Sequence, residues 1–261
     1  MVGRCFEEFQ RVPQIDHLEA GVNLLQKVHH RLDVLNSLMW QAHTTRPSME
    51  VVYRDLFVRD IAKLQLDDSY YPVGSAANYS LLYFVTRCFL EFPIRNAIEF
   101  GAGQSSVLMS QLNDRLKREA TLTTVEHDVR WADTVRAKVN HTVITAELVP
   151  KTIDGHKISH YGGEYFDSSA LYDFVLVDGP PAYKKETTFN RLGAMEVIEN
   201  NLADSFVIVI DDMQREGEQE LSKLIHRKLQ KRGCNFGEVS IRGSRPQHAF
   251  AAGSFFGAAY F

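Results

Sequence analysis

The sequence is poor in cysteine, lacks any long apolar run and carries no excess of basic charge. Its 261 residues include three cysteines, Cys5, Cys88 and Cys234, which are too scattered for a disulfide framework or a zinc cluster. Charges stand near the N-terminus where a signal peptide needs an apolar stretch, and no run reaches the ~18 apolar residues of a membrane span. The net charge of -4 argues against a nucleic-acid partner. These absences favour a cytoplasmic protein, without membrane or nucleic-acid contacts, that acts on a small molecule.

What the chain does contain is the composition of an ordinary globular protein. Hydrophobic residues make up 44% and charged residues 24%, so the chain can fold by burying a core. Its length suits one α/β domain with a helical extension. Because the residue pattern changes after Pro93, we expect a helical extension or cap over residues 1–92 and a catalytic domain over residues 93–261.

The extension is predicted to begin with a long amphipathic helix over residues 15–40. Its apolar residues recur mostly at steps of three, four or seven and form one stripe, at Leu18, Val22, Leu25, Leu32, Leu35 and Met39. Two roles are open for this stripe. It can join two copies of the chain in a homodimer, or it can pack on its own domain. The second role is favoured because His29 and Asn36 interrupt a strict heptad.

Two further helices and a loop are predicted before the catalytic domain. The apolar spacing predicts helices over residues 49–64 and 76–92. Between them, residues 70–75 read Tyr-Tyr-Pro-Val-Gly-Ser, a punctuated segment that is typical of a loop. Because this loop precedes the helix that leads into a glycine motif, it is a candidate cover for a bound ligand.

After Pro93, short apolar runs alternate with amphipathic helices, which indicates a mostly parallel sheet in a Rossmann-like three-layer α/β sandwich. Strands are predicted over residues 96–100, 122–126, 142–149, 174–178 and 206–211, with helices after the first, second, fourth and fifth. Two more strands, near 236–241 and within 249–261, complete a seven-stranded sheet. The last is expected to be antiparallel, in a hairpin or at an edge. Residues 150–171 are predicted to be a long polar insertion between the third and fourth strands.

A glycine loop at residues 99–103, Glu-Phe-Gly-Ala-Gly, follows the first predicted strand and leads straight into a helix. A loop that binds a nucleotide requires that context. Gly101 and Gly103 have no side chains, so the backbone can turn tightly and approach a ligand closely. Ser106 stands where a dinucleotide fingerprint has its third glycine, which weakens the interpretation as an NAD site.

Two acidic residues indicate which nucleotide is bound. Glu126 ends the second predicted strand, where its carboxylate can accept hydrogen bonds from both ribose hydroxyls of an adenosine, unless it only caps the following helix. Glu99 stands two residues before the first glycine of the loop. A pyrophosphate would be repelled there, whereas the ammonium and sulfonium of S-adenosylmethionine would be attracted. Together the two acids predict an S-adenosylmethionine site.

At these residues the sequence resembles the class I, Rossmann-like methyltransferases that use S-adenosylmethionine. EFGAGQSS is similar to their first motif, VEHD to their second, and YDFVLVDGPP with VIVIDDM to the segments of their fourth and fifth strands. The resemblance covers about residues 96–261. It implies cofactor contacts within these motifs, at Glu99, Gly101, Ala102, Gly103, Ser105, Glu126, His127 and Asp178.

Three carboxylates follow the fourth and fifth predicted strands. Asp178 closes one apolar run, and Asp211 with Asp212 closes the next, so all three fall at the edge where open α/β sheets bind ligands. Gathered carboxylates repel one another unless a cation neutralises them, and oxygen ligands without cysteine favour Mg²⁺ or Mn²⁺. Such an ion could bind a substrate hydroxyl and lower its pKa. In the metal-free alternative, the acids cap a loop and a helix.

The resemblance also suggests the methyl acceptor, while the general base stays open. The spacing of the acids is similar to that of metal-dependent O-methyltransferases. VDGPP, Arg191 and DDMQREGEQ resemble segments of bacterial methyltransferases and of plant glucuronoxylan O-methyltransferases. This implies a hydroxyl of a small molecule or saccharide as acceptor. Many metal-dependent relatives place a lysine or histidine where this chain has Pro181. Lys184 is therefore the candidate base, working beside Asp178, with Lys185, His156 and His160 as alternatives.

Two rival functions remain open at this point. The strand-loop-helix pattern alone also suits an NAD-dependent Rossmann oxidoreductase or epimerase. A chain that keeps the methyltransferase fold could also be a non-catalytic adaptor that binds partners through the helix over residues 15–40. The intact glycine loop and the three acids favour an enzyme over the adaptor.

Overall fold

The computed structural model describes residues 13–261; within the first helix, the side chains described are those of residues 21–36 and 39. The chain divides into two compact units, one ending at His43 and the other spanning Thr44–Phe261. Helix α1 (Pro13–Thr44) is the described part of the first unit. Helices α2 (Met49–Leu64) and α3 (Tyr79–Glu91) belong to the second, so the compact units divide earlier than residue 92. Among residues 13–261, no helix combines the length and apolar character needed to cross a bilayer.

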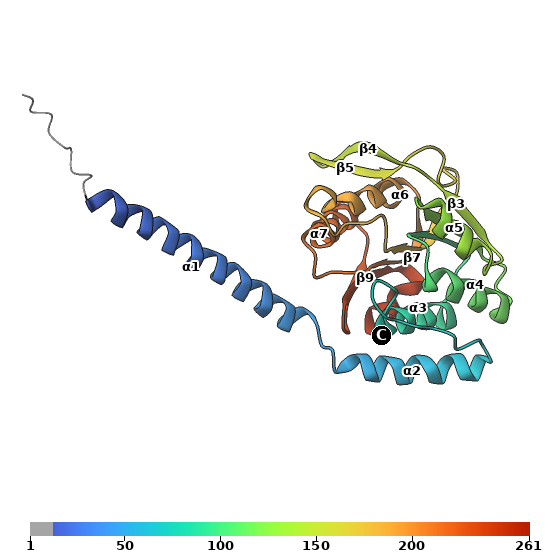
Figure 1. The fold of residues 1–261 in the computed structure, drawn as a ribbon. Helices are drawn as coiled ribbons and strands as arrows, with labels where there is room; N and C mark the ends of the chain where they lie inside the picture. The colour runs from blue at the N-terminus through green and yellow to red at the C-terminus, as the bar shows by residue number, and fades with distance from the viewer. Residues whose placement is uncertain (1–12) are drawn as a thin grey trace, which may run out of the picture. The chain divides into compact units, whose positions relative to one another are not determined.

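A seven-stranded sheet forms the centre of the second unit (Figure 1). Its strands are β1 (Asn96–Phe100), β2 (Thr121–Glu126), β3 (Thr142–Thr145), β6 (Tyr172–Val177), β7 (Leu202–Ile210), β8 (Phe236–Arg242) and β9 (Pro246–Ala252). They lie in the order β3-β2-β1-β6-β7-β9-β8. The first five strands in this order, β3, β2, β1, β6 and β7, are parallel to one another, and β9 is antiparallel to both β7 and β8. The predicted Rossmann-like sandwich with a reversed last strand is thus confirmed.

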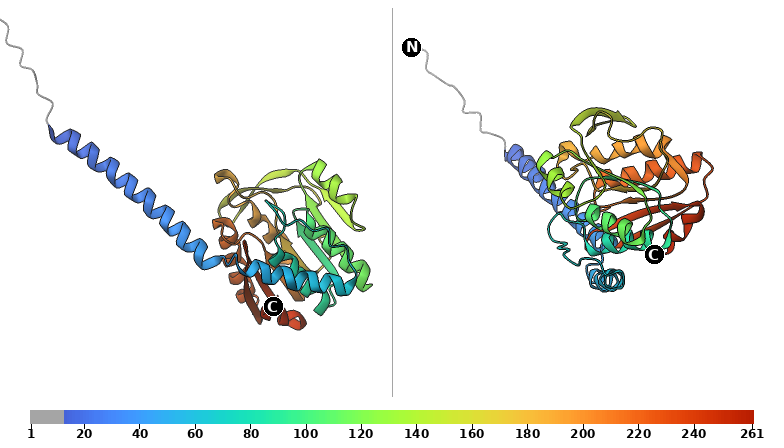
Figure 2. Two further views of the ribbon diagram at one scale, coloured as in Figure 1. Left: turned by 60° about the horizontal axis from the view of Figure 1, so that its bottom comes forward. Right: turned by 90° about the vertical axis from the view of Figure 1, so that its right-hand side faces the viewer.

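Helices cover both faces of this sheet, which explains why its central strands are apolar on both sides. The covering helices are α3 and α4 (Gln104–Leu116) on one face, and α6 (Met195–Asn200) and α7 (Glu216–Lys231) on the other (Figures 1 and 2). Successive side chains of β6 alternate between the two cores: Phe174 and Leu176 pack with α3 and α4, and Val175 and Val177 with α6 and α7. Burying one such side chain contributes roughly 1.5–3 kcal/mol.

The segment after β3 differs from the prediction. The strand expected over residues 142–149 ends at Thr145, and β4 (Leu148–Ile153) then pairs with β5 (His156–Tyr161) in a separate antiparallel hairpin. Asp154 and Gly155 form its turn, with φ values of 47° and 82°, as a tight hairpin turn requires. The first half of the supposed polar insertion is therefore a hairpin, because alternation of polar and apolar residues makes a strand even where the composition is polar.

The last two strands form an antiparallel hairpin, which confirms one of the two predicted alternatives. Strand β9 lies between β7 and β8, so β8 is the edge strand. Three short 3-10 helices complete the unit: η1 (Lys185–Thr187), η2 (Asn190–Ala194) and η3 (Gly253–Tyr260). The glycines and aromatics after Ala252 belong to η3 rather than to a strand.

Candidate active site

A cavity of about 860 Å³ lies at the carboxyl ends of four parallel strands. Its lining includes Gly101 after β1, Glu126 at the end of β2, Asp178 after β6 and Asp212 after β7. Ligands of open α/β sheets bind at this edge, and the volume is that of a small-molecule or cofactor site. The parallel order of the strands thus brings Gly101, Glu126, Asp178 and Asp212 to one place.

The backbone N–H groups of the glycine loop are all occupied within the protein. Over residues 101–103 they donate in turn to the Val125 carbonyl, the Glu126 carboxylate and the Ser106 hydroxyl, at 2.9, 3.0 and 2.9 Å. Ser106, which replaces the third glycine of a dinucleotide fingerprint, therefore holds the loop from inside. The loop is preorganised, and none of these three N–H groups is free to bind a phosphate.

Gly101 is required by its backbone and by the space around it. Its φ is 93°, a conformation that favours glycine, and a Cβ atom on it would lie 2.9 Å from the carbonyl oxygen of Asp178. Gly179 is equally confined, since its Cβ would lie 2.7 Å from the Cα of Gly101. The loops after β1 and β6 are thus in direct backbone contact, which joins the two halves of the cavity.

Glu99 does not line the cavity, which corrects the prediction that it contacts the cofactor. Its side chain is fully buried behind the loop and accepts hydrogen bonds from three hydroxyls, those of Ser105, Ser106 and Thr124. Burial raises the pKa of Glu99 to about 7. Its role is to hold the start of α4. The other predicted cofactor contacts all line the cavity: Gly101, Ala102, Gly103, Ser105, Glu126, His127 and Asp178.

Glu126 is held as an ionised acceptor at the cavity wall. Its Oε1 accepts the N–H groups of His127 and Asp128 at 2.7 and 2.9 Å. Burial opposes its ionisation, but the hydrogen bond from the His127 side chain and those from the backbone N–H groups of Asp128 and Ala102 outweigh it and lower the pKa of Glu126. Hydrogen bonding to Glu126 in turn raises the pKa of His127. Because Asp128 caps helix α5 (Val129–Arg136), Glu126 is not the helix cap.

Trp131 is a wall residue that the sequence analysis missed. Its indole Nε1 donates to the Ala102 carbonyl at 2.6 Å, and its side chain is 48% exposed beside the loop. Asp128 starts α5 by accepting the Trp131 N–H at 2.9 Å, which sets the direction of the indole. No motif marks this residue in the sequence; only its position in the first turn of α5 brings it to the cavity.

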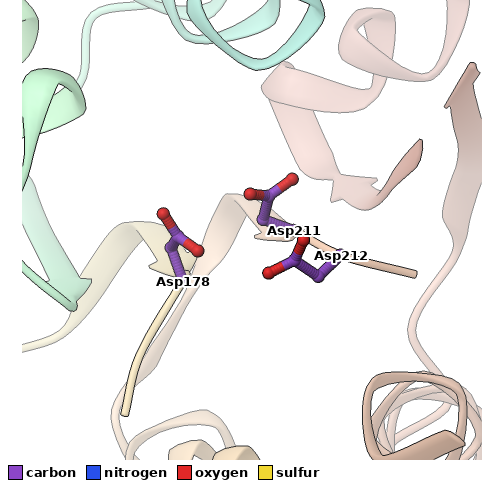
Figure 3. Close-up of side chains that lie close together, drawn as sticks. All are labelled: Asp178, Asp211 and Asp212. Atoms are coloured by element: carbon purple, nitrogen blue, oxygen red, sulfur yellow. The ribbon is translucent and has the colours of Figure 1, made fainter. Parts of the chain in front are cut away.

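Three carboxylates gather at the ends of β6 and β7, as predicted (Figure 3). One oxygen of each of Asp178, Asp211 and Asp212 lies within 4.8 Å of the others. The strands end one residue earlier than predicted, at Val177 and Ile210, so the chain has turned at the acids. Asp212 has a φ of 60°, which lets two successive side chains converge instead of pointing to opposite faces.

Arg191 is the counter-ion of this cluster, and the sequence analysis gave it no role. The guanidinium is 4% exposed, and its Nη2 lies 3.2 Å from carboxylate oxygens of both Asp178 and Asp212. Its Nη1 lies 3.3 Å from the buried Glu218. Arg215 pairs with Asp212 from the other side at 2.9 Å. Part of the neutralising charge that the three acids require therefore comes from the protein itself.

The electrostatic balance differs among the three acids. Burial, then the neighbouring Asp211, raises the pKa of Asp178, and burial with the neighbouring Asp212 raises that of Asp211. Burial also opposes ionisation of Asp212, but Arg191 and Arg215 outweigh it and lower the pKa of Asp212. The arginines thus neutralise Asp212. At Asp178 and Asp211 they do not offset burial and the repulsion between the acids, so a further positive charge would stabilise the ionised forms of both.

The acid cluster is suited to binding a divalent cation. Gln247 Nε2 donates to Asp211 Oδ1 at 2.7 Å, and Asp211 Oδ2 is buried without a hydrogen-bond partner among residues 13–261. A buried carboxylate oxygen without a partner is costly unless an ion or water satisfies it. The cluster contains only oxygen ligands, which suits Mg²⁺ or Mn²⁺. Asp178, Asp211 and Asp212 are therefore the residues that would hold such an ion.

The candidate bases other than Asp178 lie outside the cavity, which corrects the prediction for Lys184. Lys184 is exposed, with its Nζ 5.9 Å from the ring centroid of Tyr183, and does not belong to the lining. His156 packs against Phe189. His160 is fully buried, and burial lowers its pKa to about 4. The hairpin instead brings Tyr161 to the cavity, with a buried hydroxyl that has no partner in the described residues.

The loop over residues 70–75 contributes one wall of the cavity, as its place in the sequence suggested. Residues 73–77 belong to the lining. The side-chain amide of Gln104 accepts from the N–H of Tyr71 at 2.6 Å and donates to its carbonyl at 2.8 Å. Arg245 donates to the carbonyls of Gly74 and Ala76. The loop is thus tied to the start of α4 and to the segment before β9.

Comparison with known proteins found similarity only at the level of structure. No family model matches the chain, and neither does any curated protein. The O-methyltransferase TomG from Streptomyces achromogenes, solved with SAM, is 17% identical over 82% of this chain and 99% of its own, with a TM-score of 0.45. An O-methyltransferase from Bacillus cereus, solved with SAH, is 13% identical over 82% and 99%, with a TM-score of 0.43. The SAH-bound methyltransferase PaMTH1 from Podospora anserina is 10% identical over 97% and 100%, with a TM-score of 0.45. At these identities the similarity is one of fold, so the function is inferred below from the site itself.

Proposed function

We propose that the protein is an S-adenosylmethionine-dependent methyltransferase that methylates a hydroxyl of a small molecule or saccharide with the help of a divalent cation. One observation carries the proposal: a single cavity joins the glycine loop and Glu126 to the carboxylates Asp178 and Asp212. The first end suits an adenosine, because Glu126 is an ionised acceptor for ribose hydroxyls. The second end suits an acceptor hydroxyl, because its acids can orient that group.

The choice of methyl donor over dinucleotide rests on the occupied loop. The backbone of a glycine loop that binds a pyrophosphate must be free to approach it, but the N–H groups of residues 101–103 already donate within the protein. Carboxylates at Glu126 and Asp178 would also repel two phosphates. The same carboxylates would attract a ligand that carries a positive sulfonium and a positive ammonium group. Glu99, which is buried, is not needed for this preference.

The chemistry asks mainly for alignment. Asp178 is 21% exposed and stands beside Gly101, at the junction of the two ends of the cavity, where it can accept a hydrogen bond from the acceptor hydroxyl. Arg191 fixes that carboxylate by donating to its Oδ1 and to its backbone carbonyl. A divalent cation bound by the three acids would lower the pKa of the hydroxyl. Holding donor and acceptor in reacting geometry supplies much of the rate.

Calorimetric titration with S-adenosylhomocysteine and with NAD tests the choice of donor. We expect S-adenosylhomocysteine to bind and NAD to give no heat at the same concentrations. Binding of NAD alone would refute the methyltransferase and support the oxidoreductase. Absence of binding by either ligand would instead support a non-catalytic adaptor.

Titration with Mn²⁺ tests the cation separately from the donor. Asp211→Asn removes a charge but keeps the size of the side chain, and we expect it to weaken Mn²⁺ binding at least about tenfold. Asp173→Asn is the matched control, because Asp173 is also buried but accepts N–H bonds at the other end of β6. Equal Mn²⁺ affinity in both variants would mean that the acids serve only the arginine network.

A further inference from the structure

Helix α1 carries a row of apolar side chains that are exposed in a single chain. Its 32 residues extend over about 48 Å. The exposed fractions are 52% for Val22, 69% for Leu25, 51% for Leu32 and 58% for Met39. Exposed apolar rows of this length mark interaction surfaces.

The spacing of the row is that of a coiled coil. Val22, Leu25, His29, Leu32, Asn36 and Met39 follow one another at alternating steps of three and four residues. Such a row repeats every 3.5 residues, which requires a partner that is itself a helix with the same repeat. Leu25, Leu32 and Met39 take the d positions, and Val22, His29 and Asn36 take the a positions. His29 and Asn36 thus belong to the repeat instead of interrupting it.

We propose that α1 pairs with α1 of a second copy of this chain in a parallel, two-stranded coiled coil. A second copy supplies a helix with the same repeat in the same register. A polar asparagine at one a position selects two strands and a parallel register, because the two amides can then bond each other across the seam. In an antiparallel pair, Asn36 would face an apolar layer instead.

The apolar area is sufficient for a stable pair. Val28 and Leu35 flank the row and are 45% and 54% exposed. With the four apolar side chains of the row, each helix offers six, and burying them on two helices removes on the order of 1,000 Å² from water. Specific protein interfaces begin at about that size. Opposite the row, Val34 is 45% exposed and occupies the f position, which a dimer leaves in solvent.

Sedimentation equilibrium of the full chain tests the pairing. We expect a dimer whose dissociation constant rises more than about a hundredfold in the double variant Leu25→Glu/Leu32→Glu. Val34→Glu is the matched control and should leave the dimer unchanged. Near-ultraviolet circular dichroism, recorded in a Trp40→Phe background so that it reports mainly the aromatic core of residues 44–261, should be the same in all three. A wild-type monomer, a trimer, or a dimer that survives the double substitution would overturn the proposal.

Oxidative cross-linking tests the parallel register. In a chain with Cys5→Ser and Cys234→Ser, Val22→Cys should form an intermolecular disulfide on mild oxidation, because equivalent a positions face each other and Asn36 is kept. Val34→Cys should form none. A dimer in which Val22→Cys fails to cross-link would refute the parallel register. Neither measurement depends on the methyltransferase proposal, so the two can fail independently.

Discussion

The two ends of the cavity are built in different ways. At the glycine loop, the groups that hold the structure are close in sequence: Glu99, Ser105 and Ser106 lie within eight residues, and Glu126 ends the next strand. At the acid cluster, the partners come from separate segments, since Arg191 precedes α6 and Gln247 belongs to β9. A sequence motif predicts a site whose interacting residues are close in sequence. It does not predict interacting residues that only the fold brings together.

Arg191→Met should have the largest effect, because it breaks the long-range end of the site. The substitution keeps much of the side-chain volume but leaves Asp178, Asp212 and Glu218 without their shared cation. We expect a loss of about 3–5 kcal/mol in the free energy of unfolding, measured by urea denaturation. Arg227→Met is the control, since Arg227 is 54% exposed in its pair with Asp154 and should cost less than about 1 kcal/mol. Equal losses would show that the buried network contributes no more than a surface pair.

Glu99→Gln tests the local end through the pH dependence of stability. Burial raises the pKa of Glu99 to about 7 from an ordinary value of 4.5, so the folded chain holds a proton there that the unfolded chain has lost. Stability from this proton is fully present below pH 4.5 and is lost as the pH rises through 7. Between pH 4.5 and pH 7, the free energy of unfolding of the variant should therefore rise relative to that of the wild type by on the order of 3 kcal/mol.

Urea denaturation at several pH values measures that difference. Glu164→Gln, a change at an exposed carboxylate, serves as the control and should show a nearly constant difference from the wild type. A constant difference for Glu99→Gln as well would mean that Glu99 is ionised in the folded chain. The loop would then be held by a charge instead of a shared proton.

Glu126→Gln tests whether the glycine-loop end of the cavity binds the methyl donor. The variant keeps the shape of the side chain but loses the charge that makes it a strong acceptor. Charge-assisted hydrogen bonds contribute about 1.5–3 kcal/mol, so we expect S-adenosylhomocysteine affinity to fall about ten- to a hundredfold in calorimetry. Glu164→Gln again serves as the control. Unchanged affinity would remove Glu126 from the binding site.

Gln247→Leu should have the smallest effect on the acids, because it removes one bond to Asp211. The bonds of Gln247 to Ser80 and Asn78 are lost as well and support the fold instead of the acids. Without the 2.7 Å bond from Gln247, Asp211 loses the donor that orients it. Loss of such a supporting bond typically weakens metal binding 10- to 100-fold, and we expect the lower part of that range for Mn²⁺. Gln230→Leu, on the exposed side of α7, is the control. If both variants bind Mn²⁺ like the wild type, Asp211 does not depend on β9 for its position.

The features that could be predicted from the sequence are those that depend on residues close together in the chain. The spacing of apolar residues predicted α2 over its full length and β1 to the residue, because periodicity reflects which side of an element is buried. It missed the β4–β5 hairpin, whose polar composition hid its alternation. The prediction of Lys184 rested on its closeness to Asp178 in sequence, but the neighbouring Tyr183 lines the cavity and Lys184 does not.

The sequence by itself determined the order of strands and helices and the meeting of Glu126, Asp178, Asp211 and Asp212 at one edge, since parallel strands bring their carboxyl ends together. Only the tertiary structure decided that Glu99 is buried behind the loop and that Arg191 pairs with Asp178 and Asp212. Burial and charge pairing depend on neighbours from distant parts of the chain. The sequence pattern therefore predicts which residues lie on one face of a helix or strand, but not which residues pack against that face.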